Sequence, residues 1–256
     1  MGKIITFINE KGGIGKTSTC MNLAWHLSDS KKILLVDMDG QRANLTFFLG
    51  IEKAPGLITM YNILTQEREA EDGIISVKKN LDIIPADNQV ANFSQGTAKI
   101  TRMKKVMAEC REKYDYIFID VNPTPNWSHV LALSGTDFCV IPMLPDVASL
   151  EANRGIAESI EEIKETANPD LKVLGIVFNK NNNRTNLSQA VSEIAEKMAE
   201  KLDTKVFKHK IRNTVKLSEN VSLHMGITEY APVSDGAEDI RLLADEIEEE
   251  VKRYGK

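Results

Sequence analysis

The sequence predicts an α/β fold in which a mainly parallel, twisted sheet is covered by helices on both faces. Two observations lead to this prediction. Short segments composed mostly of Ile, Val, Leu and Phe recur along the chain, and such segments are typical of strands buried on both faces. Longer segments with an amphipathic, helical periodicity lie between them. Strands that alternate with helices form a mainly parallel sheet, because each helix crosses over one face of it.

The predicted elements follow one another in a simple order. The strands are expected at residues 3–8, 32–37, 81–86, 116–121, 138–143 and 172–179. The helices are expected at residues 17–28, 99–113, 150–166, 186–202 and 238–252. Residues 43–80 are less regular and are interpreted as a helical connection. No repeat or linker marks a boundary, so we expect a single domain over residues 1–256, without an amino-terminal helix-turn-helix extension.

The composition favours a cytoplasmic protein. No apolar run approaches the roughly 18 residues that span a bilayer, and the run near the amino terminus is interrupted by Asn9 and Glu10. The cysteines Cys20, Cys110 and Cys139 are far apart and have no histidine cluster near them. We therefore expect neither a disulfide framework nor a zinc site, and a reducing compartment fits best.

The stretch NEKGGIGKTST, residues 9–19, lies between the first predicted strand and the first predicted helix, as a phosphate-binding loop requires. Glycines let backbone N–H groups approach phosphate oxygens, and the start of the helix adds the positive end of its dipole. Lys16 is expected to reach the β- and γ-phosphates, and the Thr17 hydroxyl to ligate Mg²⁺. The strict pattern has glycine in place of Glu10, so the loop taken alone is also compatible with a simple tight turn. The predicted nucleotide-binding residues here are Gly12, Gly13, Ile14, Gly15, Lys16, Thr17 and Ser18.

Carboxylates at the ends of two predicted strands support the phosphate-binding interpretation. Asp37 and Asp39 end the second strand, and Asp120 lies at the end of a later one. The carboxyl ends of parallel strands meet at one edge of a sheet, so these groups are expected to face the loop. Each aspartate alone is more simply a turn or helix-cap residue. Together with the loop, they predict a site for magnesium and water.

The segments KGGIGKTSTCMNLA, ILLVDMDGQ, YDYIFIDVNP, RTNLS and VKLSE resemble the ParA branch of the ParA/MinD family of ATPases, which carry a deviant Walker A motif on a P-loop NTPase fold. The resemblance runs nearly end to end. It implies that Lys11 crosses a dimer interface to the nucleotide of a second copy, where it offsets concentrated phosphate charge. It also implies that Asp39 acts on the hydrolytic water, that Asp120 holds Mg²⁺ through water, and that Asp37 supports the metal shell. The catalytic and nucleotide-contacting residues implied are Lys11, Lys16 and Asp39.

The chain departs from the family pattern in two segments that are expected to sense the γ-phosphate. The common DPQ reads Asp39-Gly40-Gln41, and the common PP after the later aspartate reads Asn122-Pro123. Gly40 is expected to make its turn more flexible. Both changes bear on hydrolysis more than on nucleotide binding.

Two windows contain no acidic residue, although the whole chain has a net charge of -5. Residues 171–192 carry the basic residues Lys172, Lys180 and Arg184. Residues 204–218 carry Lys205, Lys208, Lys210, Arg212 and Lys216. Such a window is most often only a solvated face. The resemblance places Arg184 and Lys216 at family positions that bind DNA without sequence preference, and a phosphate contact tolerates Lys in place of Arg. It also places Asn179, Ile211 and Arg212 beside the adenine.

The resemblance implies a DNA-partitioning ATPase that uses ATP and Mg²⁺. ATP binding would form a homodimer on non-specific DNA, and a ParB-type centromere-binding protein would stimulate hydrolysis and release, in the cytoplasm on the nucleoid. A MinD-like ATPase at the membrane is the first alternative, but the last predicted helix is mainly acidic and unsuited to anionic lipid. An ATP-dependent synthetase or a metal-cluster carrier on the same fold is the second, and a carrier would need closely placed cysteines.

Overall fold

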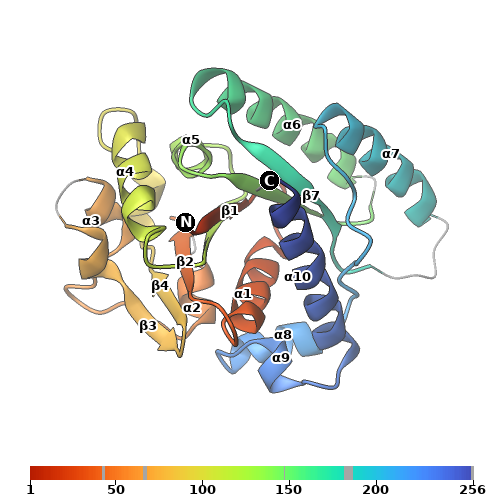
Figure 1. Cartoon of the computed structure of the whole chain (residues 1–256), viewed down its shortest axis with the longest axis horizontal. Coiled ribbons are helices and arrows are strands. Elements are labelled where there is room, and N and C mark those ends of the chain that lie inside the picture. The colour runs from red at the N-terminus through yellow and green to blue at the C-terminus, as the bar shows by residue number, and fades with distance from the viewer. Residues whose placement is uncertain (42–43, 66–67, 147, 182–186, 255–256) are drawn as a thin grey trace.

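The computed structural model describes residues 1–41, 44–65, 68–146, 148–181 and 187–254. It contains a 7-stranded sheet in the order β3-β4-β2-β5-β1-β6-β7. Helices cover both faces of this sheet (Figure 1), as the alternation of strands and helices predicts. Within the described residues, no helix is both long enough and apolar enough to cross a membrane.

The strands are β1 (Lys3–Phe7), β2 (Ile33–Met38), β3 (Ile75–Lys78), β4 (Leu81–Ile84), β5 (Tyr116–Val121), β6 (Phe138–Met143) and β7 (Lys172–Phe178). The long helices are α1 (Lys16–Leu27), α4 (Ile100–Cys110), α6 (Ala148–Thr166), α7 (Leu187–Lys201) and α10 (Asp235–Tyr254). The shorter helices are α2 (Asn44–Phe48), α3 (Met60–Leu64), α5 (Trp127–Ser134), α8 (Lys216–Ser222), α9 (Ile227–Tyr230) and the 3-10 turns η1 (Ala70–Gly73) and η2 (Asn88–Asn92). Every predicted strand and helix is therefore present, with its ends shifted by a few residues.

The segment 43–80 differs from the prediction of a helical connection. Its described part contains the short helices α2 and α3, but also the edge strand β3, which pairs antiparallel with β4. The side chains of β3 are half-buried or exposed, so the segment lacks the continuous apolar run that marks the central strands. A purely helical connection is therefore wrong here, because an edge strand needs less apolar sequence than a central one.

The sheet separates the apolar core into two layers. In β2, Leu34 and Val36 pack on the side of α4 to α7, whereas Ile33 and Leu35 pack on the side of α1 and α10. Alternate residues of a strand point to opposite faces, and here both faces are apolar because both are covered. This is why the central strands read as unbroken apolar runs.

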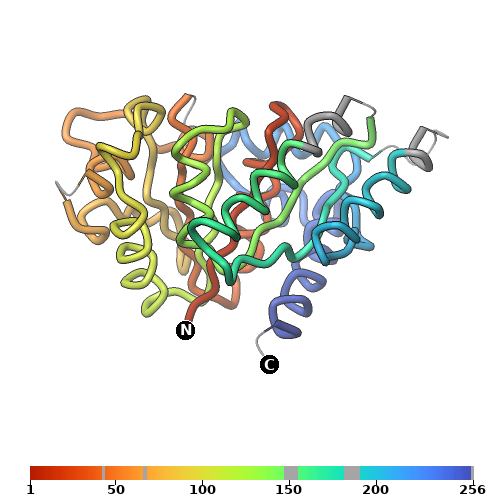
Figure 2. The backbone as a smooth tube through the Cα atoms, turned by 90° about the horizontal axis from the view of Figure 1, so that it is seen from above, coloured from red at the N-terminus to blue at the C-terminus, as the bar shows by residue number. Residues whose placement is uncertain are grey.

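The strand order brings the carboxyl ends of the central strands together. Strand β1 lies between β5 and β6, so the order of connection reverses beside it. Ligands of open α/β sheets bind outside the carboxyl ends of the strands at such a reversal. Figure 2 shows both chain termini at the opposite edge of the sheet, away from the loops that follow β1 and β2.

The outer side of β7 is also occupied. Residues 205–211 run along it, with Ile176 N donating to the carbonyl of Lys205 (2.9 Å) and Ile211 N to the carbonyl of Phe178 (2.8 Å). A parallel bridge joins Ile176 and Val206. This segment leads from α7 into α8, and it places residues 211–218 beside the loop that follows β1.

Candidate nucleotide-binding site

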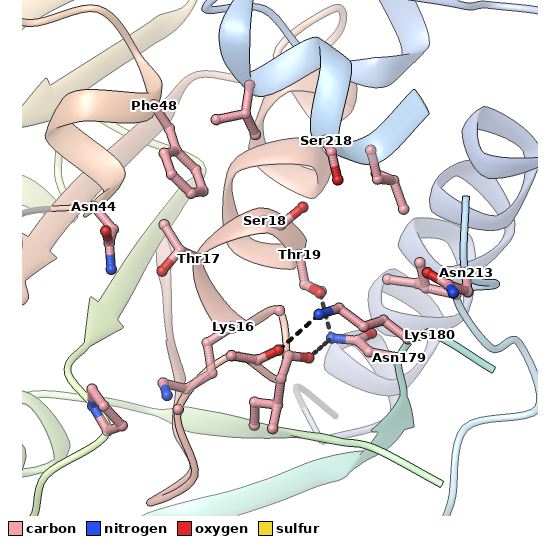
Figure 3. Close-up of a pocket in the computed structure, with 18 of the residues that line it drawn as sticks. Lys16, Thr17, Ser18, Thr19, Asn44, Phe48, Asn179, Lys180, Asn213 and Ser218 are labelled. Carbon is pink, nitrogen blue, oxygen red and sulfur yellow. Dashed lines mark hydrogen bonds between the residues drawn. The ribbon is translucent and has the colours of Figure 1, made fainter. Parts of the chain in front are cut away.

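A cavity of about 670 Å³ opens at the carboxyl edge of the sheet. Residues 12–19 line one part of it, and the ends of β2, β5 and β7 line another. The segment from Ile211 into α8 and the side chain of Phe48 on α2 complete it, as Figure 3 shows for Phe48 and Ser218. Its lining combines backbone N–H groups, lysines, an aspartate and a few apolar side chains, which is a composition typical of a ligand site.

The loop after β1 has the backbone conformation that a phosphate cradle requires. Gly13 and Gly15 have φ values of 72° and 89°, a left-handed region that favours glycine, and α1 begins directly after Gly15. Gly15 also packs against the amide of Asn179, where a Cβ would come within 2.9 Å of Nδ2. The Asn179 amide donates to the Ile14 carbonyl and to Thr19 Oγ1, both at 2.9 Å (Figure 3). The loop is therefore held in shape from beneath.

Lys16 lies inside this cradle. Its side chain is buried, and Nζ donates to the carbonyl oxygen of Lys11 at 3.2 Å. Burial lowers the pKa of Lys16, while Asp120 and Asp39 raise it in part. An anion bound in the cradle would favour the charged ammonium and could take the place of the Lys11 carbonyl.

Lys11 points away from the cradle. Its Nζ donates to Asp146 Oδ1 at 2.8 Å, just before α6 begins. Its backbone N–H donates to Asn9 Oδ1, and the buried amide of Asn9 donates to the carbonyl of Pro142 at the end of β6. The two lysines of the loop are therefore separated: Lys16 faces the cavity, and Lys11 faces the start of α6.

Two buried carboxylates lie side by side beneath the loop. Asp37 and Asp120 are paired in register on β2 and β5, and both are fully buried. Thr17 Oγ1 donates to Asp120 Oδ2 at 2.7 Å. Burial raises the pKa of Asp37 to about 6 and that of Asp120 well above its ordinary value. The charge of Asp39 raises the pKa of both further, and that of Asp37 raises the pKa of Asp120. A cation near Asp120 would remove much of this penalty.

The donors present fit magnesium. Asp120 Oδ1 is buried and has no hydrogen-bond partner among the described residues, while Oδ2 is held by Thr17. Mg²⁺ is commonly bound through one or two carboxylates together with the phosphates of a substrate. Within the described residues, no group of three or more His, Cys, Asp or Glu side chains is arranged to hold a metal ion. The Asp37 oxygens accept hydrogen bonds from Asp39 N, Thr46 N and Thr46 Oγ1. Asp37 therefore supports the site through the surrounding backbone, next to Asp120.

Asp39 lines the cavity at the start of a tightly fixed turn. Oδ1 accepts from Gln41 N at 3.0 Å, and Oδ2 accepts from Asn44 Nδ2 at 3.0 Å at the start of α2. Gly40 is buried, and a Cβ on it would overlap the backbone nitrogen of Ala91 in η2. The role expected of Gly40 from the sequence is flexibility of the turn. In the structure, glycine is needed at this position because it allows two backbone segments to pack directly together.

The segment after β5 is held by His129, which contacts both the main chain and the side chain of Asn122. His129 Nε2 lies 2.7 Å from the carbonyl oxygen of Asn122 and 3.1 Å from its Oδ1, so Nε2 carries the proton and donates. Burial lowers the pKa of His129 to about 4, which keeps the imidazole neutral. Gln41 Nε2 donates to Thr124 Oγ1 at 3.1 Å and so joins this segment to the turn of Asp39. Gly40 and Asn122, the two departures from the family pattern, therefore both make packing contacts near the cavity.

The residues expected beside adenine all line the cavity, but they differ in what their side chains do. Asn179 holds the loop, and its Oδ1 is buried without a partner among the described residues. Ile211 is buried at the cavity wall. Arg212 turns to α10, where its guanidinium forms a two-point pair with Asp239 at 2.7 Å and a further ion pair with Asp235.

Lysines of the basic window of residues 204–218 pair with carboxylates outside the window, on α10 and on α8. Lys205 pairs with Glu246 and Glu250 of α10. Lys216 Nζ lies 2.9 Å from Glu219 Oε2 and 3.5 Å from the hydroxyl of Tyr230. Local positive charge is therefore lower than the sequence indicates. Arg184, the other predicted DNA contact, lies outside the described residues.

Several residues that line the site are not found by motif reasoning. Lys180 follows the end of β7 and donates from Nζ to the Gly13 carbonyl at 2.9 Å. Its place after a buried strand is the same signal that pointed to Asp39, so it could have been found. Asn44, Phe48 and Asn213 also line the cavity, but they come from short helices and loops that carry no motif. Ser218 lines it too, and it lies in the VKLSE segment, where only Lys216 is predicted to have a role.

A glycine loop that opens a helix, a buried lysine within it and a threonine–carboxylate pair beside it define a P-loop nucleoside-triphosphate-binding protein. A family described as "AAA domain" matches residues 2–173. Sporulation initiation inhibitor protein Soj of Bacillus subtilis strain 168 is 36% identical over 253 residues, which cover 96% of this chain and 98% of Soj. The chromosome-partitioning ATPase Soj of Thermus thermophilus is 31% identical, over 95% of this chain and 94% of its own.

One solved structure with the same fold is the septum site-determining protein MinD of Pyrococcus horikoshii OT3, complexed with Mg-ADP. It has a TM-score of 0.78 and 24% identity, and the match covers 96% of each chain. The chain belongs to the ParA/MinD family of ATPases.

Proposed function

We propose that this chain is a DNA-partitioning ATPase that binds ATP with Mg²⁺, dimerises when ATP is bound and releases DNA after hydrolysis. The observation that carries this proposal is the separation of the two loop lysines. Lys16 lies in the cradle of its own chain, whereas Lys11 Nζ contacts Asp146 outside it. Lys16 binds the nucleotide of its own chain, and Lys11 binds the nucleotide of a second copy.

Nucleotide binding begins with an exchange of partners in the loop. Lys16 gives up the Lys11 carbonyl and donates to the β- and γ-phosphates, while the backbone N–H groups around Gly13 and Gly15 hold their oxygens. Thr17 and Asp120 would hold Mg²⁺, which would withdraw charge from the phosphates. Asn179 Oδ1 and the backbone near Ile211 meet the adenine.

Hydrolysis needs a water aligned with the γ-phosphate. Asp39 is buried at the cavity wall, and its carboxylate is oriented by Gln41 N and Asn44 Nδ2. A carboxylate held in this way can accept a hydrogen bond from that water and orient it. Lys11 of the second copy would stabilise the charge that develops on the phosphate oxygens.

DNA binding is supported by the partitioning relatives and by the exposed Lys216 at the start of α8. Phosphate contacts carry no sequence information, so such binding is non-specific. A dimer doubles the number of these contacts, which makes DNA affinity dependent on ATP. A ParB-type protein bound to a centromere would then stimulate hydrolysis and local release.

The membrane-bound alternative has less support. The apolar side of α10, with Ile240, Leu243 and Ile247, is buried and packs against α1. An amphipathic helix that binds lipid needs its apolar side exposed. The metal-cluster carrier has less support too, because Cys20, Cys110 and Cys139 are buried in separate places.

The test combines ATP turnover with DNA binding. ATP hydrolysis is measured with unrelated DNA fragments of equal length, with anionic vesicles and with neither, and DNA binding is followed by fluorescence anisotropy over a salt series. We expect binding that requires ATP, is about equal for all fragments and falls steeply with salt. In the double variant Arg184→Glu, Lys216→Glu, binding should weaken for every fragment and the salt dependence should flatten, with dimerisation kept. Unchanged DNA binding in this variant, or ATP-dependent binding to vesicles, would contradict the proposal.

A further inference from the structure

We infer that Glu10 is a positioning residue for Lys11, and that it acts by fastening the outer half of the loop to α6. This inference rests on the proposed role of Lys11 in a dimer. The relevant contact is the Glu10 seat, which consists of the Glu10 carboxylate, the hydroxyl of Ser159 and the space beside Gly155. Glu10 stands where a strict phosphate-binding loop has glycine, so its presence needs a specific reason.

The first observation is the contact itself. Ser159 Oγ donates to Glu10 Oε1 at 2.9 Å across a separation of 149 residues. The carboxylate is thereby turned away from the cavity, and Glu10 is not among the residues that line it. A negative charge directed into a phosphate cradle would oppose nucleotide binding, so this orientation removes the conflict between Glu10 and the loop.

The second observation is the space beside Gly155. A Cβ at this position would overlap the Glu10 carboxylate. Glycine is a poor residue for the interior of a helix such as α6, because it loses more backbone entropy than other residues do. Its presence opposite Glu10 lets the carboxylate approach the helix backbone closely.

The third observation is that the neighbouring residue is fastened to the same part of the fold. Lys11 Nζ contacts Asp146 directly before α6, so two consecutive loop residues contact the segment of residues 146–159. The Lys11 carbonyl accepts a hydrogen bond from Lys16 Nζ, and in the proposed function Lys16 exchanges this contact for the phosphates. The Glu10 seat and the Asn9 contact to Lys11 N then keep the backbone of Lys11 in place.

The consequence is that the Glu10 seat controls where Lys11 is presented, and does not control nucleotide affinity. In Glu10→Ala, the outer half of the loop loses its attachment to α6, and Lys11 is less well placed to reach a second nucleotide. Glu10→Gln keeps an oxygen that accepts from Ser159 and should restore the wild-type behaviour. Ser159→Ala and Gly155→Ala disturb the same contact from the side of α6.

The experiment measures two quantities for each variant: ATP affinity, by fluorescent nucleotide titration, and ATP-dependent dimerisation, by sedimentation velocity with ATP and Mg²⁺. For Glu10→Ala and Ser159→Ala, we expect ATP affinity within about twofold of wild type and dimerisation about fivefold weaker or more, which is the effect of losing about one hydrogen bond. Lys11→Ala is the reference for complete loss of dimerisation. Glu158→Ala, an exposed acid beside Ser159 on α6, is the matched control and should behave as wild type.

Each result separates the inference from the proposed function. If wild-type protein does not dimerise with ATP, the proposed function fails before Glu10 is tested. If wild type dimerises and Glu10→Ala dimerises equally well, the inference is overturned while the proposed function stands. If Glu10→Gln is as defective as Glu10→Ala, the charge and not the contact with Ser159 matters, which also overturns the inference. Far-UV circular dichroism of each variant verifies that the overall helix content of the protein is unchanged.

Discussion

The Asp39 carboxylate has two roles: it accepts the hydrogen bonds that fix its turn, and it faces the cavity. Comparing a mutation of Asp39 with a mutation of its hydrogen-bond partner Asn44 separates these roles. In Asp39→Ala, we expect ATP affinity to change little, because Lys16 and the loop remain. Turnover should fall by about a hundredfold or more, the range for losing a group that acts on the reacting water. Nucleotide titration and phosphate release measure the two quantities separately.

The matched control is Asn44→Ala. It removes the hydrogen bond from Asn44 Nδ2 to Asp39 Oδ2 but keeps the carboxylate. If Asp39 serves only to attach α2, both variants should lose turnover equally. If Asp39 acts on water, Asn44→Ala should be much milder. Full turnover in Asp39→Ala would remove this residue from the mechanism.

The site residues that the sequence predicts are those that lie close together along the chain or end an apolar run. The loop from Gly12 to Ser18 is one continuous stretch, and Asp37, Asp39 and Asp120 follow strands whose ends must meet. The contact of Lys11 with Asp146 could not be predicted. It joins groups 135 positions apart and depends on how β6 leads into α6.

The turn after β2 and the segment η2 are packed backbone against backbone at Gly40. Gly40→Ala should destabilise the protein by about 2 kcal/mol, because the new methyl group must displace the backbone of Val90 and Ala91. The midpoint of urea unfolding measures this. Gly96→Ala is the control, since Gly96 is exposed and the nearest atom to its Cβ position is Ser94 Oγ at 3.8 Å. Equal midpoints for the two variants would contradict the packing argument.

The exposed Lys216 of α8 forms an ion pair with Glu219 on the same helix. Glu219 Oε2 accepts from Lys216 Nζ at 2.9 Å and from the Tyr230 hydroxyl at 2.7 Å, and this contact raises the pKa of Lys216 and lowers that of Glu219. In Glu219→Gln, DNA affinity with ATP should increase, and the salt dependence should steepen by about 0.9 for each additional phosphate that the protein neutralises. Fluorescence anisotropy over a salt series measures both.

The control for this prediction is Glu238→Gln. Glu238 pairs with Arg241 at 3.6 Å on α10, so the variant changes the net charge equally but leaves Lys216 unaltered. An equal gain in both variants would indicate a general charge effect. No gain in Glu219→Gln, while wild type binds DNA, would show that Lys216 is not limited by its carboxylate neighbour.

Elements with a strong apolar pattern are predicted well, and elements that depend on distant partners are not. The central strands are apolar on both faces, which leaves a continuous signal in the sequence. Strand β3 is a half-buried edge strand, so its pattern is weak. The basic window of residues 204–218 is visible in the sequence, but its pairing with Glu246 and Glu250 requires knowing that α10 returns beside it.

The cysteines report on the integrity of the whole core. Burial raises the pKa of Cys110 and of Cys139 to about 12 and raises that of Cys20 well above its ordinary value. Native protein at pH 8 should therefore resist iodoacetamide, whereas protein unfolded in guanidinium should react fully. Mass spectrometry over time measures the extent of alkylation. Because Cys20 lies on α1 behind the loop, ATP should slow its alkylation further. Rapid modification of native protein would contradict the burial.

The two outer strands of the sheet limit how copies of this protein can associate. The free side of β7 is taken by residues 205–211 of the same chain, and β3 is short, irregular in register and carries Lys78. Long, flat, unpaired strands invite other chains to add to a sheet and aggregate, and short or covered ones discourage it. If copies gather on one DNA molecule as proposed, they would meet through side chains and nucleotide and not by strand addition, and hydrolysis of ATP would then be able to reverse their assembly.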